Sequence, residues 1–74
     1  MKKYLIIDMV NPNEEVTEMT KDDFFQSLAY NIEVAVEYED FKNFEEALCY
    51  VLDELHYSNE VEINGFIYKI EEVN

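Results

Sequence analysis

The chain has 74 residues, of which 49% are hydrophobic and 15% aromatic, a composition that predicts a folded protein and excludes a disordered one. Eighteen acidic residues outnumber five lysines, no arginine is present, and the formal net charge is −13. So negative a surface repels DNA, RNA and anionic membranes, which excludes direct binding to them as an expected function. The length predicts one acidic domain over residues 1–74.

A domain of this size has a small core and often needs an additional source of stability. The single cysteine, Cys49, excludes an internal disulfide, and the single histidine, His56, argues against a structural zinc site. Dense packing and self-association as a homodimer are therefore both open.

The apolar run that follows Lys2 and Lys3 covers only residues 4–7, which is too short for a secretory signal. The chain also has no stretch near the ~20 apolar residues that a membrane span requires. These features predict a cytoplasmic protein.

Residues 3–10 are predicted to form the first strand, because apolar side chains alternate along them. The two faces of that strand carry Leu5, Ile7 and Met9 on one side and Tyr4, Ile6 and Asp8 on the other. The Asn-Pro-Asn segment at 11–13 ends the strand, since proline cannot donate a ladder hydrogen bond.

A first helix is predicted to begin after Thr20, a favourable N-cap residue, and to end near Tyr38. Its apolar stripe has helical spacing and consists of Phe24, Phe25, Leu28, Ala29, Ile32 and Val36. Residues 32–38 also alternate as a strand would, so a short strand there is the alternative. The helix is favoured because a break at Asn31 would leave almost no connecting loop.

A second helix is predicted after Asn43, which with Glu46 forms a capping box. Its expected core positions are Phe44, Ala47, Leu48, Val51, Leu52 and Leu55.

Asn64-Gly65 predicts a two-residue hairpin turn that pairs Ile63 with Phe66 and Val61 with Tyr68. The outer face of that hairpin would pair Glu60 with Lys69. The expected fold is therefore α+β with the order β-α-α-β-β: a helical hairpin packed on a three-stranded, mostly antiparallel sheet.

Residue types needed for catalysis are scarce. Cys49 and His56 lie about two helical turns apart, roughly 10 Å along the axis, too far for a hydrogen bond. Cys49 is expected to be a partly buried small residue.

The run that starts at Asn11 resembles a calcium loop only weakly, because Val16 stands where glycine is needed. Gly65 is the only glycine, so there is no glycine-rich phosphate loop. We expect no enzyme activity, no cofactor and no metal.

The acids instead gather on the predicted outer faces of the two helices and in the turn between them, on the side opposite the sheet. Tyrosine is enriched at interfaces, and three tyrosines, Tyr30, Tyr50 and Tyr57, fall among these acids. The predicted partner-binding residues are Asp22, Asp23, Tyr30, Glu33, Glu37, Glu39, Asp40, Glu45, Glu46, Tyr50, Asp53 and Glu54.

Acids four residues apart on a helix are ~6 Å apart along its axis. Packed helices lie ~8–10 Å apart, within the range of DNA groove widths of ~6 and ~12 Å. Two rows of carboxylates could therefore imitate two phosphate rows. Glu37, Asp53 and Glu54 are expected near helix C-termini, where the helix dipole disfavours negative charge. Negative charge at such positions favours a binding function over a merely solvated face.

In length, acidic stretches and lack of arginine, the chain resembles the small acidic DNA-mimic inhibitors that phages make against host DNA-binding proteins. It is most similar in character to the inhibitors of the sliding clamp made by staphylococcal phages. The acidic stretches that carry this resemblance are residues 33–40, Glu45-Glu46 and Asp53-Glu54. The resemblance implies a dimeric inhibitor in the host cytoplasm that occupies the basic, DNA-encircling channel of the clamp. The alternative is an acidic adaptor or regulatory protein that binds a partner helix or peptide through an apolar groove near Phe41 and Tyr50.

Overall fold

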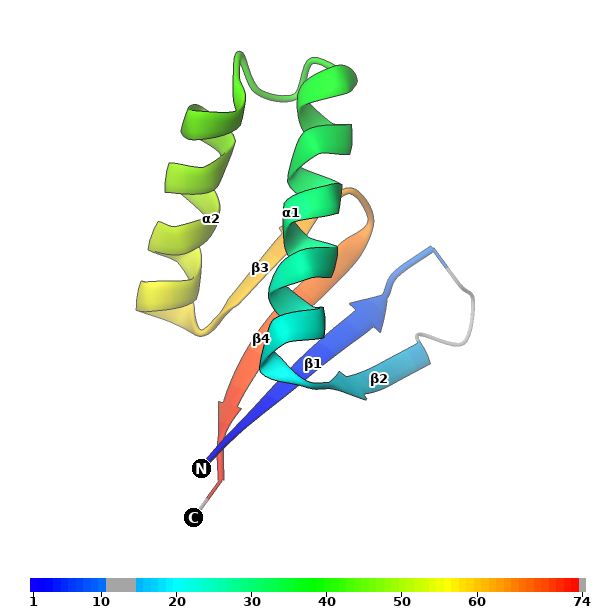
Figure 1. Cartoon of the computed structure of the whole chain (residues 1–74), viewed down its shortest axis with the longest axis vertical. Coiled ribbons are helices and arrows are strands. Elements are labelled where there is room, and N and C mark those ends of the chain that lie inside the picture. The colour runs from blue at the N-terminus through cyan, green and yellow to red at the C-terminus, as the bar shows by residue number, and fades with distance from the viewer. Residues whose placement is uncertain (11–14, 74) are drawn as a thin grey trace.

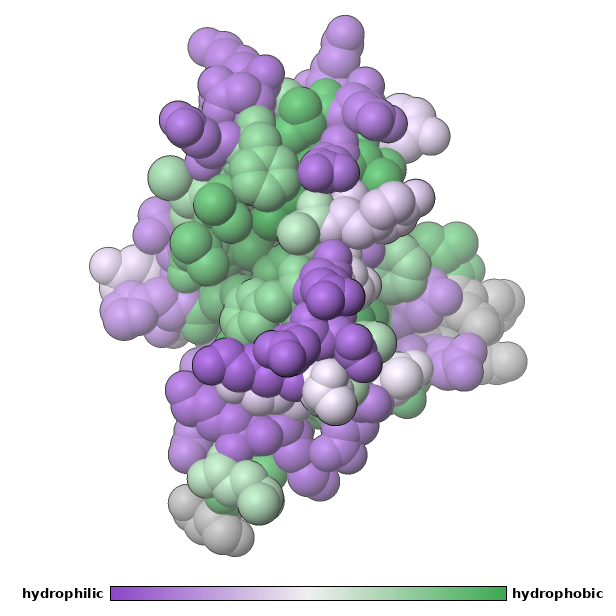
Figure 2. Space-filling model, in the orientation of Figure 1, coloured by the Kyte–Doolittle hydropathy of each residue, from purple (hydrophilic) through white to green (hydrophobic). Residues whose placement is uncertain are grey.

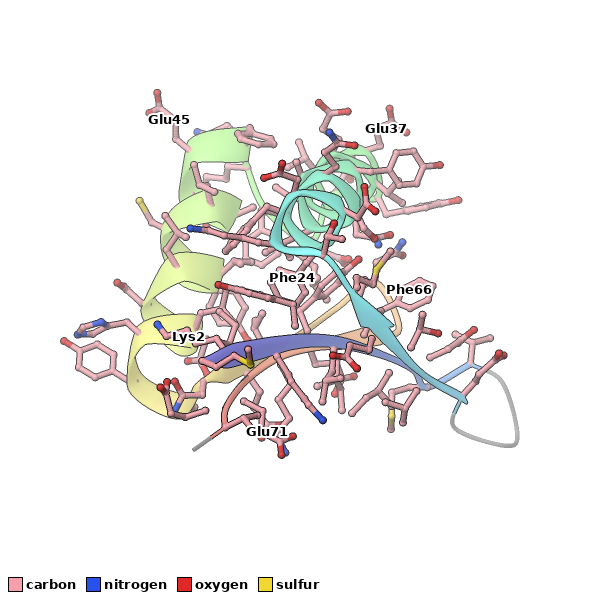
Figure 3. The ribbon with its side chains drawn as sticks, turned by 60° about the horizontal axis from the view of Figure 1, so that its bottom comes forward. Lys2, Phe24, Glu37, Glu45, Phe66 and Glu71 are labelled. Carbon is pink, nitrogen blue, oxygen red and sulfur yellow. The ribbon has the colours of Figure 1, made fainter. Side chains whose placement is uncertain are left out.

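The computed structural model describes residues 1–10 and 15–73. Within them the chain forms β1 (Lys2–Asp8), β2 (Glu15–Met19), α1 (Lys21–Glu37), α2 (Phe44–Ser58), β3 (Glu60–Ile63) and β4 (Phe66–Glu72) (Figure 1). The strands make one antiparallel sheet in the order β2-β1-β4-β3. Both helices pack on the same face of this sheet, as Figure 3 shows from a second direction. The α+β class and the helical hairpin are confirmed.

The prediction of a three-stranded sheet is wrong, because residues 15–19 form a fourth strand. This strand, β2, pairs antiparallel with β1, with Ile6 opposite Thr17 and Ile7 opposite Val16. It is an edge strand, and all but its last residue are exposed. The weak calcium-loop match begins in residues 11–14, outside the described residues, and continues into this strand.

Both predicted helix starts are confirmed. The Thr20 side chain accepts a hydrogen bond from the Asp23 N–H at 3.2 Å, and Asn43 accepts one from the Glu46 N–H at 2.9 Å. The first helix continues without interruption to Glu37, so the alternative of a strand over residues 32–38 is wrong. Ile32 and Ala35 are both buried, and their spacing of three residues puts them on the same face of a helix but on opposite faces of a strand.

The core of α2 is narrower than its apolar spacing predicts. Ala47, Val51 and Leu55 are buried, whereas Phe44 is 38% exposed and Leu52 is 49% exposed. Both exposed side chains belong to the predicted apolar stripe, and the structure corrects that assignment. Leu52 lies on the edge of the stripe and opens onto a surface hollow that is described below.

The C-terminal hairpin has the predicted register, with Ile63 opposite Phe66, Val61 opposite Tyr68 and Glu60 opposite Lys69. Asn64 and Gly65 both have positive φ, at 52° and 81°, as a primed hairpin turn requires. A Cβ atom at Gly65 would lie 2.7 Å from Val10 Cγ2, so close packing as well as backbone conformation favours glycine there.

Tyr68 and Phe24 are fully buried between the sheet and α1. The Tyr68 hydroxyl is hydrogen-bonded to Ser27 Oγ at 2.9 Å and accepts a hydrogen bond from Asn31 Nδ2. Asn31, which is only 5% exposed, in turn accepts a hydrogen bond from Asn64 Nδ2 at 2.8 Å. This chain of hydrogen bonds fixes α1 to the hairpin turn and satisfies the polar groups that it buries.

Candidate partner-binding surface

Nine of the ten predicted acids are exposed on the two helices and in the turn between them, and the tenth, Glu54, is half-buried. Figure 3 shows Glu37 and Glu45 pointing away from the sheet and Glu71 on its opposite face. We call this region the helical acidic surface. It consists of Asp22, Asp23, Glu33, Glu37, Glu39, Asp40, Glu45, Glu46 and Asp53, all of which are exposed. None of these acids makes an ion pair with another described residue.

Some of these acids have a structural reason for their position. Asp22 and Asp23 lie in the first turn of α1, and Glu45 and Glu46 lie in the first turn of α2. Negative charge is stabilising at a helix N-terminus because the N–H dipoles point toward it. These four acids therefore do not by themselves indicate a binding function.

The C-terminal end of α1 is different. Glu37 is its last residue, and no basic residue lies in its last turn. Glu33 precedes Glu37 by four positions, so two like charges are neighbours on one helix face. Stability alone would favour lysine at either position, because a cation interacts favourably with the C-terminal end of the dipole.

Glu39 occupies a backbone conformation that favours glycine. Its φ is +64°, and it ends α1 in a Schellman motif. In this motif the Glu39 N–H donates to the Val36 carbonyl and the Asp40 N–H donates to the Ala35 carbonyl, each at 3.0 Å. A side chain with a Cβ atom is disfavoured there, so the end of α1 carries a carboxylate at a site where glycine would be more stable.

We expect Glu39→Gly to raise the free energy of unfolding by about 0.5–1 kcal/mol, because it relieves the left-handed conformation. Urea denaturation followed by circular dichroism measures this change. Glu39→Gln is the matched control, since it removes the charge but keeps the Cβ atom, and it should recover less than half of the gain. A lower stability for the glycine variant would contradict the argument that Glu39 is strained.

The prediction that Asp53 and Glu54 lie near the C-terminus of their helix is wrong. The second helix extends to Ser58, so Asp53 and Glu54 lie before its last turn, which instead contains His56. The dipole argument therefore does not apply to either acid, since the effect is confined to the last turn. Glu54 is also half-buried, because it adjoins the buried Leu55 on the inner side of the helix.

The open face of the sheet is acidic too, but its charges are partly neutralised. Glu60 lies opposite Lys69, and Glu71 lies opposite Lys3, in the register of the sheet. Cross-strand pairs of opposite charge at these positions reduce the local field. The helical acidic surface has no such pairs, so it is the stronger candidate for binding a basic partner.

Two open hollows adjoin the helices. The larger, of about 640 Å³, lies at the turn between them and is lined by Val36, Phe41, Lys42, Glu37, Glu39, Asp40 and Glu46. Phe41 packs against Tyr50, with ring centroids 5.5 Å apart, and Tyr50 remains 42% exposed. Tyr30, the other predicted contact tyrosine, is exposed on α1. An apolar floor and an acidic rim therefore occur together at this end of the molecule, and Figure 2 shows apolar side chains between the helices bordered by hydrophilic ones.

The exposed thiol of Cys49 shows that the prediction of partial burial is wrong. Among the described residues, no group of three or more potential metal ligands is close enough to hold an ion. In the same part of the chain, no helix has the length and apolar character needed to cross a membrane.

The molecule is thus a small α+β protein with an acidic helical hairpin on a four-stranded antiparallel sheet. Comparisons with protein-family models, curated proteins and solved structures found no match for the chain.

Proposed function

We propose that the chain is a DNA-mimicking inhibitor that binds the basic DNA site of a host DNA-binding protein and blocks access of DNA to it. The replication sliding clamp is the specific partner that we propose, on the resemblance described above. Inhibition would be steric, and long-range attraction between the acidic surface and the basic site would speed association.

The observation that carries this proposal is the placement of negative charge at the end of α1. Glu37 is the last helical residue without a compensating base, and Glu39 stands at a positive-φ site that favours glycine. A surface selected only for solubility would not require acids at positions that lower stability. Acids at these positions are expected if their charge contacts a partner.

The arrangement of the helices also supports the proposal. The two helices run side by side in opposite directions (Figure 1). Both carry exposed acids, which would form two adjacent rows: Glu33 and Glu37 on α1, and Glu45, Glu46 and Asp53 on α2. The separation of packed helices, ~8–10 Å, lies within the range of DNA groove widths. Two such rows can meet basic side chains that normally contact two phosphate strands.

Competition with DNA tests this function. The purified sliding clamp would be titrated with the chain in the presence of a fluorescent duplex, with anisotropy reporting bound DNA. We expect the chain to displace the duplex, and we expect its own affinity for the clamp to fall as salt rises. A complex that holds both the chain and the duplex would contradict mimicry. If the clamp does not bind, capture of partners from a host lysate, with elution by salt, would supply the protein for the same competition.

A second candidate is favoured by the apolar floor of the larger hollow. An adaptor that binds a partner helix or peptide would use Phe41 and the exposed Tyr50, whose rings are in contact. Its complex should survive ~0.5 M salt, where the Debye length falls below ~8 Å. It should also be weakened by Phe41→Ala more than by neutralisation of Glu33 and Glu37, which is the opposite of the order expected for a DNA mimic.

A further inference from the structure

The smaller hollow lies away from the acidic turn, where the C-terminal half of α2 meets α1, β1 and β4. Its volume is about 410 Å³, and it is lined by Lys2, Phe25, Leu52, Leu55, His56, Asn59 and Ile70. None of these residues is acidic, although 18 of the 74 residues in the chain are. We call it the basal hollow.

The floor of the basal hollow is apolar. Leu55 is buried, and Phe25 and Ile70 are half-buried against the core. Leu52 completes the floor but is 49% exposed, although its helical spacing predicts a core position. The hollow therefore contains apolar surface that remains open to solvent, beside a polar surface of similar extent on its rim.

The rim of the basal hollow carries hydrogen-bond donors and positive charge. Lys2 comes from the start of β1 and lies beside the last turns of α2, and His56 comes from the last turn of α2 (Figure 3). Asn59, the left-handed C-cap residue of that helix, adds a side-chain amide. Neither Lys2 nor His56 makes an ion pair with a described residue. Glu72, which is opposite Lys2 in the register of the sheet, instead lies 3.7 Å from the N-terminal ammonium.

We propose that the basal hollow binds a small amphipathic anion, namely a carboxylate on a medium-length alkyl chain. The carboxylate would accept hydrogen bonds from Lys2, His56 and Asn59, and the chain would cover Leu52, Phe25 and Ile70. The volume of the hollow lies within the range of about 300–1,000 Å³ that is typical of small-molecule sites, which combine apolar lining with a few polar groups that orient the ligand.

The negative charge of the molecule limits how many negative charges its ligand can carry. A nucleic acid or an acidic peptide carries many negative charges and would be repelled by a net charge of −13. A single carboxylate carries the smallest charge that the rim can recognise, and its alkyl chain is not affected by the field. This inference does not depend on the proposed function, because the hollow lies outside the helical acidic surface.

Octanoate is a suitable probe, titrated into the full-length ¹⁵N-labelled chain and followed by NMR. We expect saturable shifts of the amides of Lys2, Leu52, His56 and Asn59. Acetate lacks the apolar chain and octylammonium reverses the charge, so each should bind at least about tenfold more weakly than octanoate. Octylammonium loses the charge-assisted hydrogen bonds, and acetate loses an apolar contact of comparable energy. Octylammonium binding as tightly as octanoate, or shifts spread over the open face of the sheet, would overturn the proposal.

Two variants separate the rim from the floor. Lys2→Gln and Leu52→Asn alter exposed side chains, and each should weaken octanoate binding at least about fivefold. Lys42→Gln removes the same charge at the opposite end of the helices and Val16→Asn removes an exposed apolar side chain on β2, so both should leave the affinity within about twofold. An unchanged affinity in Lys2→Gln would overturn recognition of the carboxylate, and an unchanged affinity in Leu52→Asn would overturn the apolar floor.

Discussion

Neutralising Glu33, Glu37, Glu39 and Asp53 together, by Gln and Asn, is expected to weaken binding to a basic partner about 4- to 1,000-fold at low salt. Each exposed charge contact contributes about 0.2–1 kcal/mol, so four contacts that all face the partner contribute about 0.8–4 kcal/mol. Isothermal titration calorimetry or surface plasmon resonance with the purified partner measures the change. The four residues are exposed, and none makes an ion pair with a described residue, so the fold should be retained.

The matched control neutralises Glu18, Glu60, Glu62 and Glu71 on the open face of the sheet. Both variants change the net charge from −13 to about −9, so they have the same long-range electrostatic effect. The control should lose less than about threefold in affinity, because the register of the sheet places its acids on the face opposite the buried Ile6 and Tyr68, as Figure 3 shows for Glu71. Equal losses would mean that only net charge matters, which would contradict a defined binding surface on the helices.

Local signals in the sequence predicted most of the elements. Thr20 and Asn43 are caps whose side chains accept a backbone hydrogen bond, and Asn64-Gly65 supplies the two positive φ values of its turn. Each signal depends on chemistry within four residues, which is why it can be read without knowledge of the fold. The continuation of α1 past Asn31 was also predicted from local sequence, because a break there would leave almost no residues to connect a helix to a following strand.

The strand β2 could not be predicted by the same reasoning. Its sequence, residues 15–19, has two acids and little apolar alternation, because as an edge strand it buries almost no side chain. Its pairing depends on β1, which is a non-local interaction. The β-branched pair Val16-Thr17 just after the Asn-Pro-Asn segment was the one signal that suggests a returning strand.

The candidate surface was predictable where it depends on charge and unpredictable where it depends on shape. Exposed acids on helix faces follow from helical periodicity, so the rows of carboxylates were expected. The left-handed conformation of Glu39 and the half-burial of Glu54 depend on how each helix ends and packs. Lys2 and His56 line the same hollow although they are 54 positions apart in the chain, and periodicity carries no information about such an arrangement.

Phe24→Ala is expected to lower the free energy of unfolding by about 3–5 kcal/mol, as large-to-small changes of buried aromatic residues do. Phe24 is fully buried, and its ring lies 5.3 Å from that of Tyr4 and 5.4 Å from that of Tyr68. It therefore joins α1 to both central strands. A chain of 74 residues has a total stability of roughly 4–11 kcal/mol, so this one change removes a large part of it. Urea denaturation at 25 °C, followed by circular dichroism, measures the loss.

Phe25→Ala is the matched control, because it removes the same ring from the adjacent position of the same helix. Phe25 is only half-buried and borders the basal hollow, so part of its surface is already in contact with water. Its removal leaves an enlarged depression that water can fill, whereas removal of Phe24 leaves a cavity beneath the helix. The Phe25 variant should therefore lose at most about half as much stability as the Phe24 variant. Equal losses would show that the Phe25 side of α1 is packed as tightly as its buried face, which would contradict an open basal hollow.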